Sequence, residues 1–157
     1  MSLKKESVWD YPRPPKPEQF SGHTRIIHQG KIIADSNRAL RILETSHPPS
    51  YYIPIHDVQM DLLIMNDKKS FCEWKGSANY LDLKIDDQII KNVGWLYKNP
   101  SKRYPELKDT ISFYASKLDE CLVNDEKVQA QEGDFYGGWI TTNIKGPFKG
   151  GAGTFGW

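Results

Sequence analysis

The stretch FCEWKGSANY, residues 71–80, decides the predicted fold because it reads as one central β-strand. Successive side chains of a strand point to opposite faces of its sheet. The even-numbered positions are mostly apolar, and we expect them to pack on the core: Cys72, Trp74, Gly76, Ala78 and Tyr80. The opposite face carries Glu73 and Lys75, which would lie roughly 7 Å apart because a strand rises about 3.3 Å per residue.

An acid and a base side by side on this strand are candidates for catalysis. A neighbouring ammonium tunes the pKa of a carboxylate, and such tuning is typical of active sites. Glu73 is therefore a candidate general base, and Lys75 a candidate group for stabilising an anion. The alternative is a solvated face on which the two charges form an ion pair worth under about 1 kcal/mol.

Short segments around this stretch have the pattern of β-hairpins. Residues 25–34, 81–91 and 118–129 each hold two apolar runs separated by turn residues. Residues 38–44 are expected to form a further strand, with a capped helical turn as the alternative. The composition, with 12% aromatic residues, 12 glycines and 10 prolines, fits many short strands joined by turns.

One helix is predicted over residues 106–115. Pro105 stands at its start, and Leu107, Ile111 and Tyr114 recur on one helical stripe. We therefore expect a mainly β single domain of antiparallel strands, in tent- or barrel-like sheets, with this one short helix near residues 105–115.

The charge balance and the cysteines limit the function classes. The net charge is +1, from 21 Lys+Arg and 20 Asp+Glu, so we expect neither a nucleic-acid polymer nor a membrane surface as partner. No apolar run approaches the roughly 18 residues that a transmembrane helix needs. The start lacks the apolar core of a signal peptide.

Cys72 and Cys121 show no metal-type spacing and read as reduced thiols. We expect a cytoplasmic protein, a monomer or weak homodimer, without a metal site.

The two ends of the chain have unusual compositions. Residues 1–20 are rich in proline and predict an extended arm that Trp9 and Tyr11 pin to the domain of residues 21–157; a disordered linker is the alternative. The segment 135–157 is rich in glycine and aromatic residues.

Backbone amides of the glycine-rich tail could hold an anion such as phosphate beside Lys145 and Lys149. The alternative is a terminal strand that only packs on the domain. The pattern matches neither a Walker loop nor a dinucleotide-binding fingerprint, because no helix follows it.

A proline-stiffened loop supplies a second group of candidates. Glu44, His47, Tyr51 and Tyr52 surround Pro48-Pro49, which makes the loop a candidate rim with a carboxylate, a base and two phenols. If exposed, His47 titrates near neutral pH and can shuttle protons. The alternative is a simple turn with His47 in solvent.

Arginine and aromatic residues complete the candidate site. Arg38 and Arg41 could bind a phosphate or carboxylate, or only keep a strand edge soluble. An aromatic pocket for a flat or cationic ligand could be formed by Trp74, Trp95, Tyr136 and Trp139. Core packing is the alternative use of these rings.

Several segments resemble one known family, the domain-of-unknown-function family 427 (DUF427). They are SVWDYPRPP (7–15), IADSNRALRILETSHPPSYYIP (33–54), FCEWKGSANY (71–80), FYASKLDECLVNDEKV (113–128) and FYGGWITTNIKGPFKGGAGTFGW (135–157). The resemblance implies a small, mainly β, cytosolic domain of a type common in bacteria, and it carries no established activity. The nucleotidyltransferase label sometimes attached to this family is discounted, because the chain lacks the Gly-Ser and Asp-x-Asp motifs of such enzymes.

We expect the protein to bind a small molecule in an aromatic-lined polar pocket, as a binding protein or as an enzyme of unknown reaction. An enzyme would use Glu73 or His47 as general base and Lys75 or Arg41 to stabilise an anion. The alternative is a non-catalytic interaction module that meets a partner chain through the N-terminal arm and the glycine-rich tail.

Overall fold

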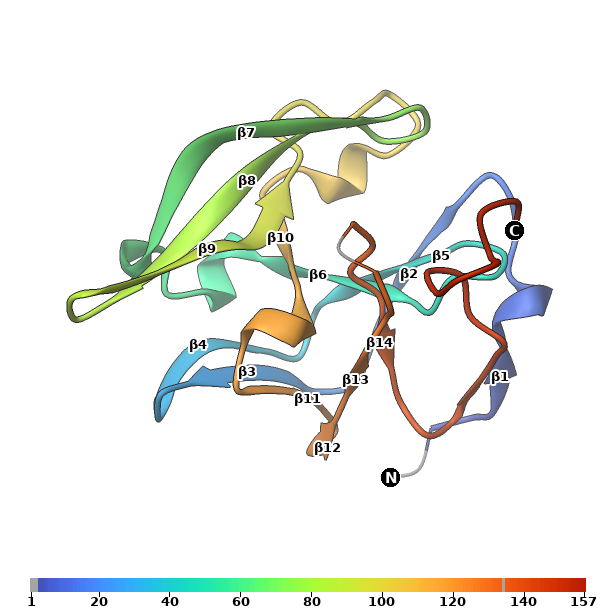
Figure 1. Ribbon diagram of the computed structural model, residues 1–157, viewed down its shortest axis with the longest axis horizontal. Helices are drawn as coiled ribbons and strands as arrows, with labels where there is room; N and C mark the ends of the chain where they lie inside the picture. The colour runs from blue at the N-terminus through green and yellow to red at the C-terminus, as the bar shows by residue number, and fades with distance from the viewer. Residues whose placement is uncertain (1–2, 134) are drawn as a thin grey trace.

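The computed structural model describes residues 3–133 and 135–157. A seven-stranded antiparallel sheet forms its largest part (Figure 1). In spatial order its strands are β2 (Lys16–Gln19), β5 (Leu40–Leu43), β6 (Ser50–Pro54), β10 (Thr110–Phe113), β9 (Gln88–Leu96), β8 (Gly76–Ile85) and β7 (Leu63–Cys72).

Three smaller sheets complete the β structure. The four-stranded sheet has the order β12 (Glu126–Lys127), β11 (Glu120–Val123), β3 (Thr24–His28) and β4 (Lys31–Ser36). The two-stranded sheets pair β1 (Glu6–Ser7) with β15 (Ile144–Lys145) and β13 (Gln129–Ala130) with β14 (Trp139–Ile140). The helical segments are three-residue 3-10 turns at Val8–Asp10, Ile55–Asp57, Met60–Leu62, Pro105–Leu107 and Ala115–Lys117.

The predicted mainly β, antiparallel fold is confirmed, although no sheet of the described residues closes into a barrel. The three predicted hairpins are present as β3–β4, β8–β9 and β11–β12. Their turns contain residues with positive φ, including Gly30 and Asn124, as tight hairpin turns require. Residues 38–44 contain β5 and not a helical turn.

Two apolar clusters lie on opposite faces of the large sheet. Tyr51 and Tyr52 are consecutive in β6 and therefore point to different faces. The cluster that contains Tyr51 includes Ile26 of β3 and Ile33 of β4, so it joins the large sheet to the four-stranded sheet below it in Figure 1. The cluster that contains Tyr52 is mostly aromatic, and Trp95 is one of its members.

The central stretch 71–80 is a hairpin, so the prediction of one strand is wrong there. Cys72 is the register partner of Gly76, and Glu73-Trp74-Lys75 form the turn between β7 and β8. Gly76 has φ +108°, a conformation that L side chains rarely adopt, and it allows the chain to reverse at this point. Glu73 and Lys75 therefore lie in a turn and not on one face of a strand.

The predicted helix over residues 106–115 is also wrong. Pro105–Leu107 forms a single 3-10 turn, and Asp109 then has φ +60°, which ends it. Thr110–Phe113 is buried at every position and pairs with β6 and β9. A strand buried on both faces has no period of two, and this is why its apolar residues could imitate a helical stripe.

The described parts of the two terminal segments, residues 3–20 and 135–157, contact the large sheet and each other. In the N-terminal segment, β1 pairs with β15 and β2 pairs with β5. The buried Arg41 of β5 holds this segment, because its guanidinium bonds Glu6 Oε2 at 3.1 Å and Glu18 Oε1 at 2.5 Å. Trp9 Nε1 donates to the Pro147 carbonyl at 2.8 Å, so the N-terminal segment and the glycine-rich tail lie side by side.

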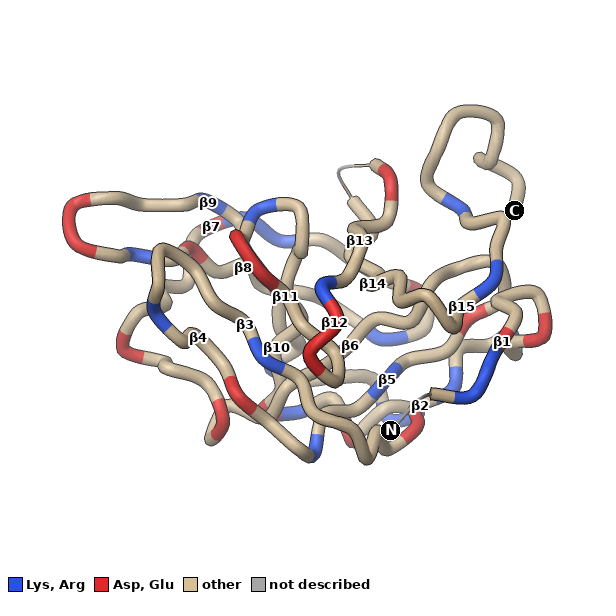
Figure 2. Tube along the Cα trace, turned by 90° about the horizontal axis from the view of Figure 1, so that it is seen from below, with Lys and Arg blue, Asp and Glu red and all other residues tan. Residues whose placement is uncertain are grey.

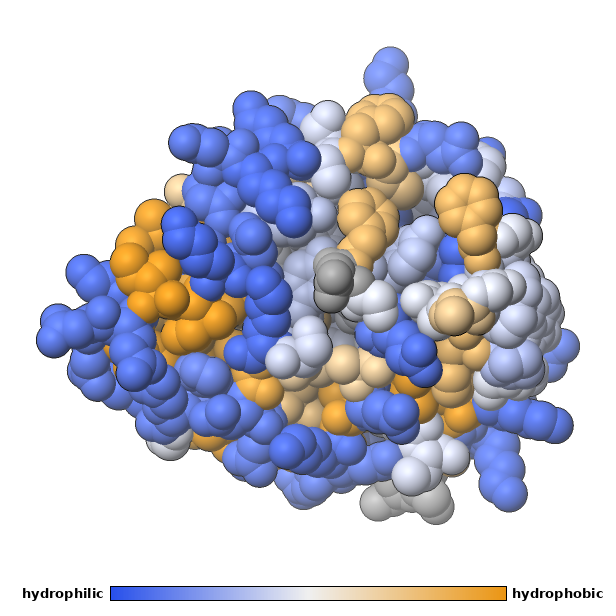
Figure 3. All heavy atoms as spheres, viewed as in Figure 1, coloured by the Kyte–Doolittle hydropathy of each residue, from blue (hydrophilic) through white to orange (hydrophobic). Residues whose placement is uncertain are grey.

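Acidic and basic residues alternate over most of the trace, in keeping with the net charge of +1, whereas residues 135–157 hold two lysines and no acidic residue (Figure 2). Exposed apolar side chains gather at the end of the molecule where the β8–β9 hairpin lies (Figure 3). Ile64 of β7 and Ile89 of β9 are about half exposed, and neither lines the cavity described below. No helix among the described residues has the length and hydropathy to span a membrane.

The turn at Gly76 predicts a measurable stability effect. Gly76→Ala adds a Cβ to a backbone with φ +108°, and we expect it to lower the free energy of unfolding by about 1–3 kcal/mol. Urea unfolding measures this change. Gly156→Ala is the matched control, because a Cβ at Gly156 meets no atom within 4 Å and its φ is not positive. Equal stability of the two variants would contradict the strained turn.

Candidate functional site

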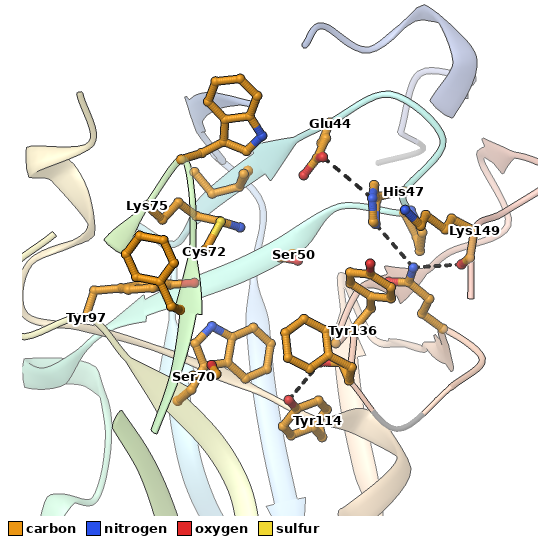
Figure 4. Close-up of a pocket in the computed structure, with 18 of the residues that line it drawn as sticks. Glu44, His47, Ser50, Ser70, Cys72, Lys75, Tyr97, Tyr114, Tyr136 and Lys149 are labelled. Carbon is orange, nitrogen blue, oxygen red and sulfur yellow. Dashed lines mark hydrogen bonds and ion pairs between the residues drawn. The ribbon is translucent and has the colours of Figure 1, made fainter. Parts of the chain in front are cut away.

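A cavity of about 270 Å³ opens on the aromatic face of the large sheet (Figure 4). Aromatic side chains form most of its walls: Phe71, Trp74, Tyr80, Trp95, Tyr97, Tyr114, Phe135 and Tyr136. Polar and charged side chains also line it: Glu44, His47, Ser50, Ser70, Cys72, Glu73, Lys75, Gln131 and Lys149. Apolar walls with a few polar groups are typical of small-molecule sites.

The floor of the cavity is built from β8, β9 and the residue after β10. Tyr80 and Trp95 are register partners, and the ring centroids of Trp95 and Tyr114 are 4.7 Å apart. Trp95 Nε1 donates to the Tyr52 hydroxyl at 3.3 Å. Burial raises the pKa of Tyr52, Tyr97 and Tyr114, so these phenols are neutral at physiological pH.

A glycine lets the C-terminal segment approach this floor. A Cβ at Gly137 would overlap the ring of Trp95, so only glycine fits there without a shift. The Tyr114 hydroxyl donates to the Phe135 carbonyl at 2.9 Å. The segment is thereby held over the floor, and Tyr136 lines the cavity from this side (Figure 4).

The β7–β8 turn forms the opposite wall, and its position is fixed by a neighbouring loop. Ser101 N donates to the Lys75 carbonyl at 2.9 Å, and Ser101 Oγ donates to the Trp74 carbonyl at 2.6 Å. The Arg103 guanidinium lies 5.9 Å from the Trp74 ring centroid, within cation–π range. The turn therefore presents Lys75 to the cavity from an anchored backbone.

The two lysines of the cavity differ in their partners. Lys149 Nζ donates to the Trp157 carbonyl at 3.2 Å and lies 5.5 Å from the Tyr136 ring centroid. Within residues 3–133 and 135–157, no ion pair joins Lys75 Nζ to a carboxylate. Lys75 is therefore the cavity cation whose charge is available to a ligand.

His47 is held by the side-chain amide of the buried Gln131. Gln131 Oε1 accepts a hydrogen bond from Gly138 N at 3.0 Å, so its Nε2 is the donor. Nε2 donates to the Lys149 carbonyl at 2.7 Å and points its other hydrogen at His47 Nδ1, 3.4 Å away. This network assigns the proton of the neutral imidazole to Nε2.

Burial is the main cause that lowers the pKa of His47 to about 4, and the cations Lys149, Lys75 and Arg13 add to it. The Glu44 carboxylate lies 3.6 Å from His47 Nε2. The imidazole is therefore neutral at physiological pH, and its Nε2–H faces Glu44.

The structure brings eight of the fourteen predicted site residues to this cavity. They are Glu44, His47, Glu73, Trp74, Lys75, Trp95, Tyr136 and Lys149. The proline-stiffened loop and the 73–75 turn, which are distant in the sequence, thus face each other across one space (Figure 4).

The other six predicted site residues lie elsewhere. Arg38 pairs with Asp57 at 2.8 Å on the surface, Arg41 is buried in the ion pairs of the N-terminal segment, and Lys145 lies exposed in β15. Tyr51, Tyr52 and Trp139 are fully buried core residues that do not line the cavity.

Sequence reasoning missed several lining residues. Tyr114 was assigned to the predicted helix, and Gln131 stands alone after a hairpin with no motif around it. Cys72 was placed on the core face of the supposed central strand, whereas the turn after it turns its side chain into the cavity (Figure 4). A glycine after the Glu-Trp-Lys run was the signal for that turn.

No group of three or more His, Cys, Asp or Glu side chains in the described residues could hold a metal ion.

The buried imidazole predicts a pH dependence of stability. Between pH 6.5 and pH 4 the unfolded chain binds a proton on His47 and the folded chain does not, so the free energy of unfolding falls as the pH decreases through this window. Urea unfolding at pH 7 and at pH 4.5 measures this decrease in the free energy of unfolding. We expect the decrease to be smaller in His47→Gln than in the wild type, by up to about 3 kcal/mol. An NMR titration of the His47 ring with a midpoint near 6.5 would contradict the buried neutral state.

A family model described as a domain of unknown function (DUF427) matches residues 16–124, which is more than half of the chain. The name of this model also carries the nucleotidyltransferase label. The matched region includes the floor of the cavity and the β7–β8 turn, and it ends before Gln131, Tyr136 and Lys149. A comparison with curated proteins gave no match. The chain belongs to the DUF427 family.

Proposed function

We propose that this protein binds a small aromatic anion in the cavity, with Lys75 as its counter-ion. The observation that carries the proposal is the Lys75 ammonium, which lines an aromatic cavity and forms no ion pair with any described carboxylate. A cation without a partner in a partly desolvated space favours a ligand of opposite charge.

The size of the cavity limits the ligand. Its volume of about 270 Å³ lies just below the range of roughly 300–1,000 Å³ that is typical of ligand pockets. A molecule with one or two rings matches this space, whereas a dinucleotide exceeds it. The rings of Trp95, Tyr114 and Tyr136 offer faces and edges on which a planar ligand can stack.

The charges around the cavity support an anion over a cation. Glu44 already has Arg13 Nε at 3.9 Å and the N–H of His47 at 3.6 Å from its carboxylate. Glu73 lies in the exposed part of the turn, where solvent screens its charge. Because both acids are balanced or screened and Lys149 is held by the Trp157 carbonyl, Lys75 is the cation that is left to pair with an anion.

The interaction-module alternative has one observation in its favour. Trp9 is 43% exposed and Phe155 is 95% exposed, and both belong to the surface where the N-terminal segment meets the glycine-rich tail. Exposed aromatic side chains are enriched at protein interfaces. A partner that binds there would lose affinity in Phe155→Ser and not in Lys75→Met.

A thermal-shift comparison tests the proposed function. We expect benzoate, phenylpyruvate and indole-3-acetate to stabilise the protein, and benzylamine and cyclohexanecarboxylate to do so weakly or not at all. A ligand at 100 times its Kd adds about 2.7 kcal/mol of stability, which corresponds to a rise in Tm of roughly 5–10 °C for a domain of this size.

Two lysine variants test whether the aromatic acids bind beside Lys75. Lys75→Met should weaken binding of the aromatic acids at least about tenfold, because it removes a partly desolvated ion pair. Lys84→Met is the matched control, since Lys84 is exposed in β8 and does not line the cavity. Equal binding by benzylamine and benzoate, or unchanged binding in Lys75→Met, would contradict the proposal.

A further inference from the structure

We propose that Glu44 acts as a general base in this cavity and that the protein enolises aromatic 2-oxo acids, an inference that rests on the binding function proposed above. It names a reaction and a substrate class for the same site. Three features of the described residues carry it: the Glu44 carboxylate without a hydrogen-bond donor, the tautomer of His47, and the position of Lys75.

The nearest nitrogen atoms of His47 and Arg13 contact the Glu44 carboxylate at Oε2. Oε2 lies 3.6 Å from His47 Nε2 and 3.9 Å from Arg13 Nε. Within residues 3–133 and 135–157, no N–H or O–H group is hydrogen-bonded to Oε1. The carboxylate therefore has polar neighbours close to Oε2 and no hydrogen-bond donor on Oε1, so its lone pairs remain available to a ligand. A general base must have a free lone pair within reach of the proton that it abstracts.

His47 orients Glu44 and is not itself the base. Its Nδ1 faces the donor Nε2 of Gln131, and its Nε2 carries the proton that faces Glu44. Neither ring nitrogen therefore offers a lone pair to the cavity. Gln131, His47 and Glu44 form a chain of contacts in which each side chain positions the next, so His47 is a positioning residue.

Lys75 and Glu44 enter the cavity from different walls. Lys75 belongs to the β7–β8 turn and Glu44 follows β5, and Figure 4 shows both side chains directed at the space above Ser50. A ligand whose ring stacks on Trp95 can place an oxygen anion near Lys75 and a C–H bond near Glu44. An aromatic 2-oxo acid has these three parts in one small molecule.

The step is balanced without a further reactant. Glu44 Oε1 takes the proton from C3 of the 2-oxo acid, and the C3–H electron pair forms the C2–C3 double bond. The carbonyl π electrons move to oxygen, and the charge of the resulting enolate is paired with Lys75. Glu44 then returns a proton to the enolate oxygen or to C3, so the carboxylate is regenerated.

Exchange of the C3 hydrogens of phenylpyruvate in D₂O tests the inference. We expect the protein to accelerate loss of the C3–H signal in proton NMR above the rate in buffer. Glu44→Gln should lower the catalysed rate at least about 100-fold, because a positioned general base contributes a factor of roughly 10²–10⁴. The matched control is Glu106→Gln, since Glu106 is exposed and does not line the cavity.

Further variants separate catalysis from folding and test the role of His47. Glu44→Asp keeps a carboxylate at a shorter reach and should retain part of the rate if Glu44→Gln is unstable. His47→Gln keeps an N–H donor near the position of Nε2, so it should exchange faster than His47→Leu, with kcat and not KM carrying the difference.

The outcomes distinguish this inference from the binding function. If phenylpyruvate stabilises the protein and exchange does not exceed the buffer rate, the catalytic role is overturned and binding stands. Exchange at the wild-type rate in Glu44→Gln overturns the role of Glu44. Binding of benzoate without binding of phenylpyruvate overturns the substrate class, and failure of every aromatic acid to bind overturns the proposed function as well.

Discussion

The packing of Trp139 holds the C-terminal segment and the loop of His47, which both line the cavity, against the large sheet. This side chain is fully buried, stacks on Tyr51 of β6 with 5.1 Å between ring centroids, and donates from Nε1 to the Phe113 carbonyl of β10 at 2.9 Å. Its backbone N–H donates to the Pro49 carbonyl at 2.8 Å. One residue thus joins the C-terminal segment both to the large sheet and to the loop of His47, and the site needs both.

The cavity exists because, among the described residues, no second sheet covers the aromatic face of the large sheet. The four-stranded sheet covers the other face, where aliphatic side chains pack. On the aromatic face, the β7–β8 turn and the C-terminal segment cover the rings only partly, and the space between them is the cavity. The polar groups come from these covering segments, in line with the general placement of functional residues on loops over a rigid sheet.

Local patterns predicted the hairpins well and the central elements poorly. The turns after His28 and Ile85 and at Asn124-Asp125 carry residues that suit tight turns, so periodicity and turn chemistry agreed. Thr110–Phe113 is buried on both faces, so its sequence pattern fits a helix as well as a strand. The residues around Gly76 fit a continuous strand as well as a hairpin turn. In both cases the pairing with neighbouring strands, which the local sequence does not contain, decides between the two structures. The positions of Glu44, His47 and Lys75 at the cavity were predictable because proline and charge marked their segments, whereas the position of Gln131 depends on contacts between segments distant in the sequence.

The central claim is that an aromatic anion binds in the cavity, which Trp95 lines, and not beside the buried Trp139. The indole N–H signals in a nitrogen–proton correlation spectrum test this directly, because Trp95 lines the cavity and Trp139 does not. On titration with benzoate, we expect the Trp95 signal to shift with a saturating curve and the Trp139 signal to stay in place. A spectrum in which Trp95 is unmoved while the Trp9 signal, at the surface of the N-terminal segment, shifts would contradict the account.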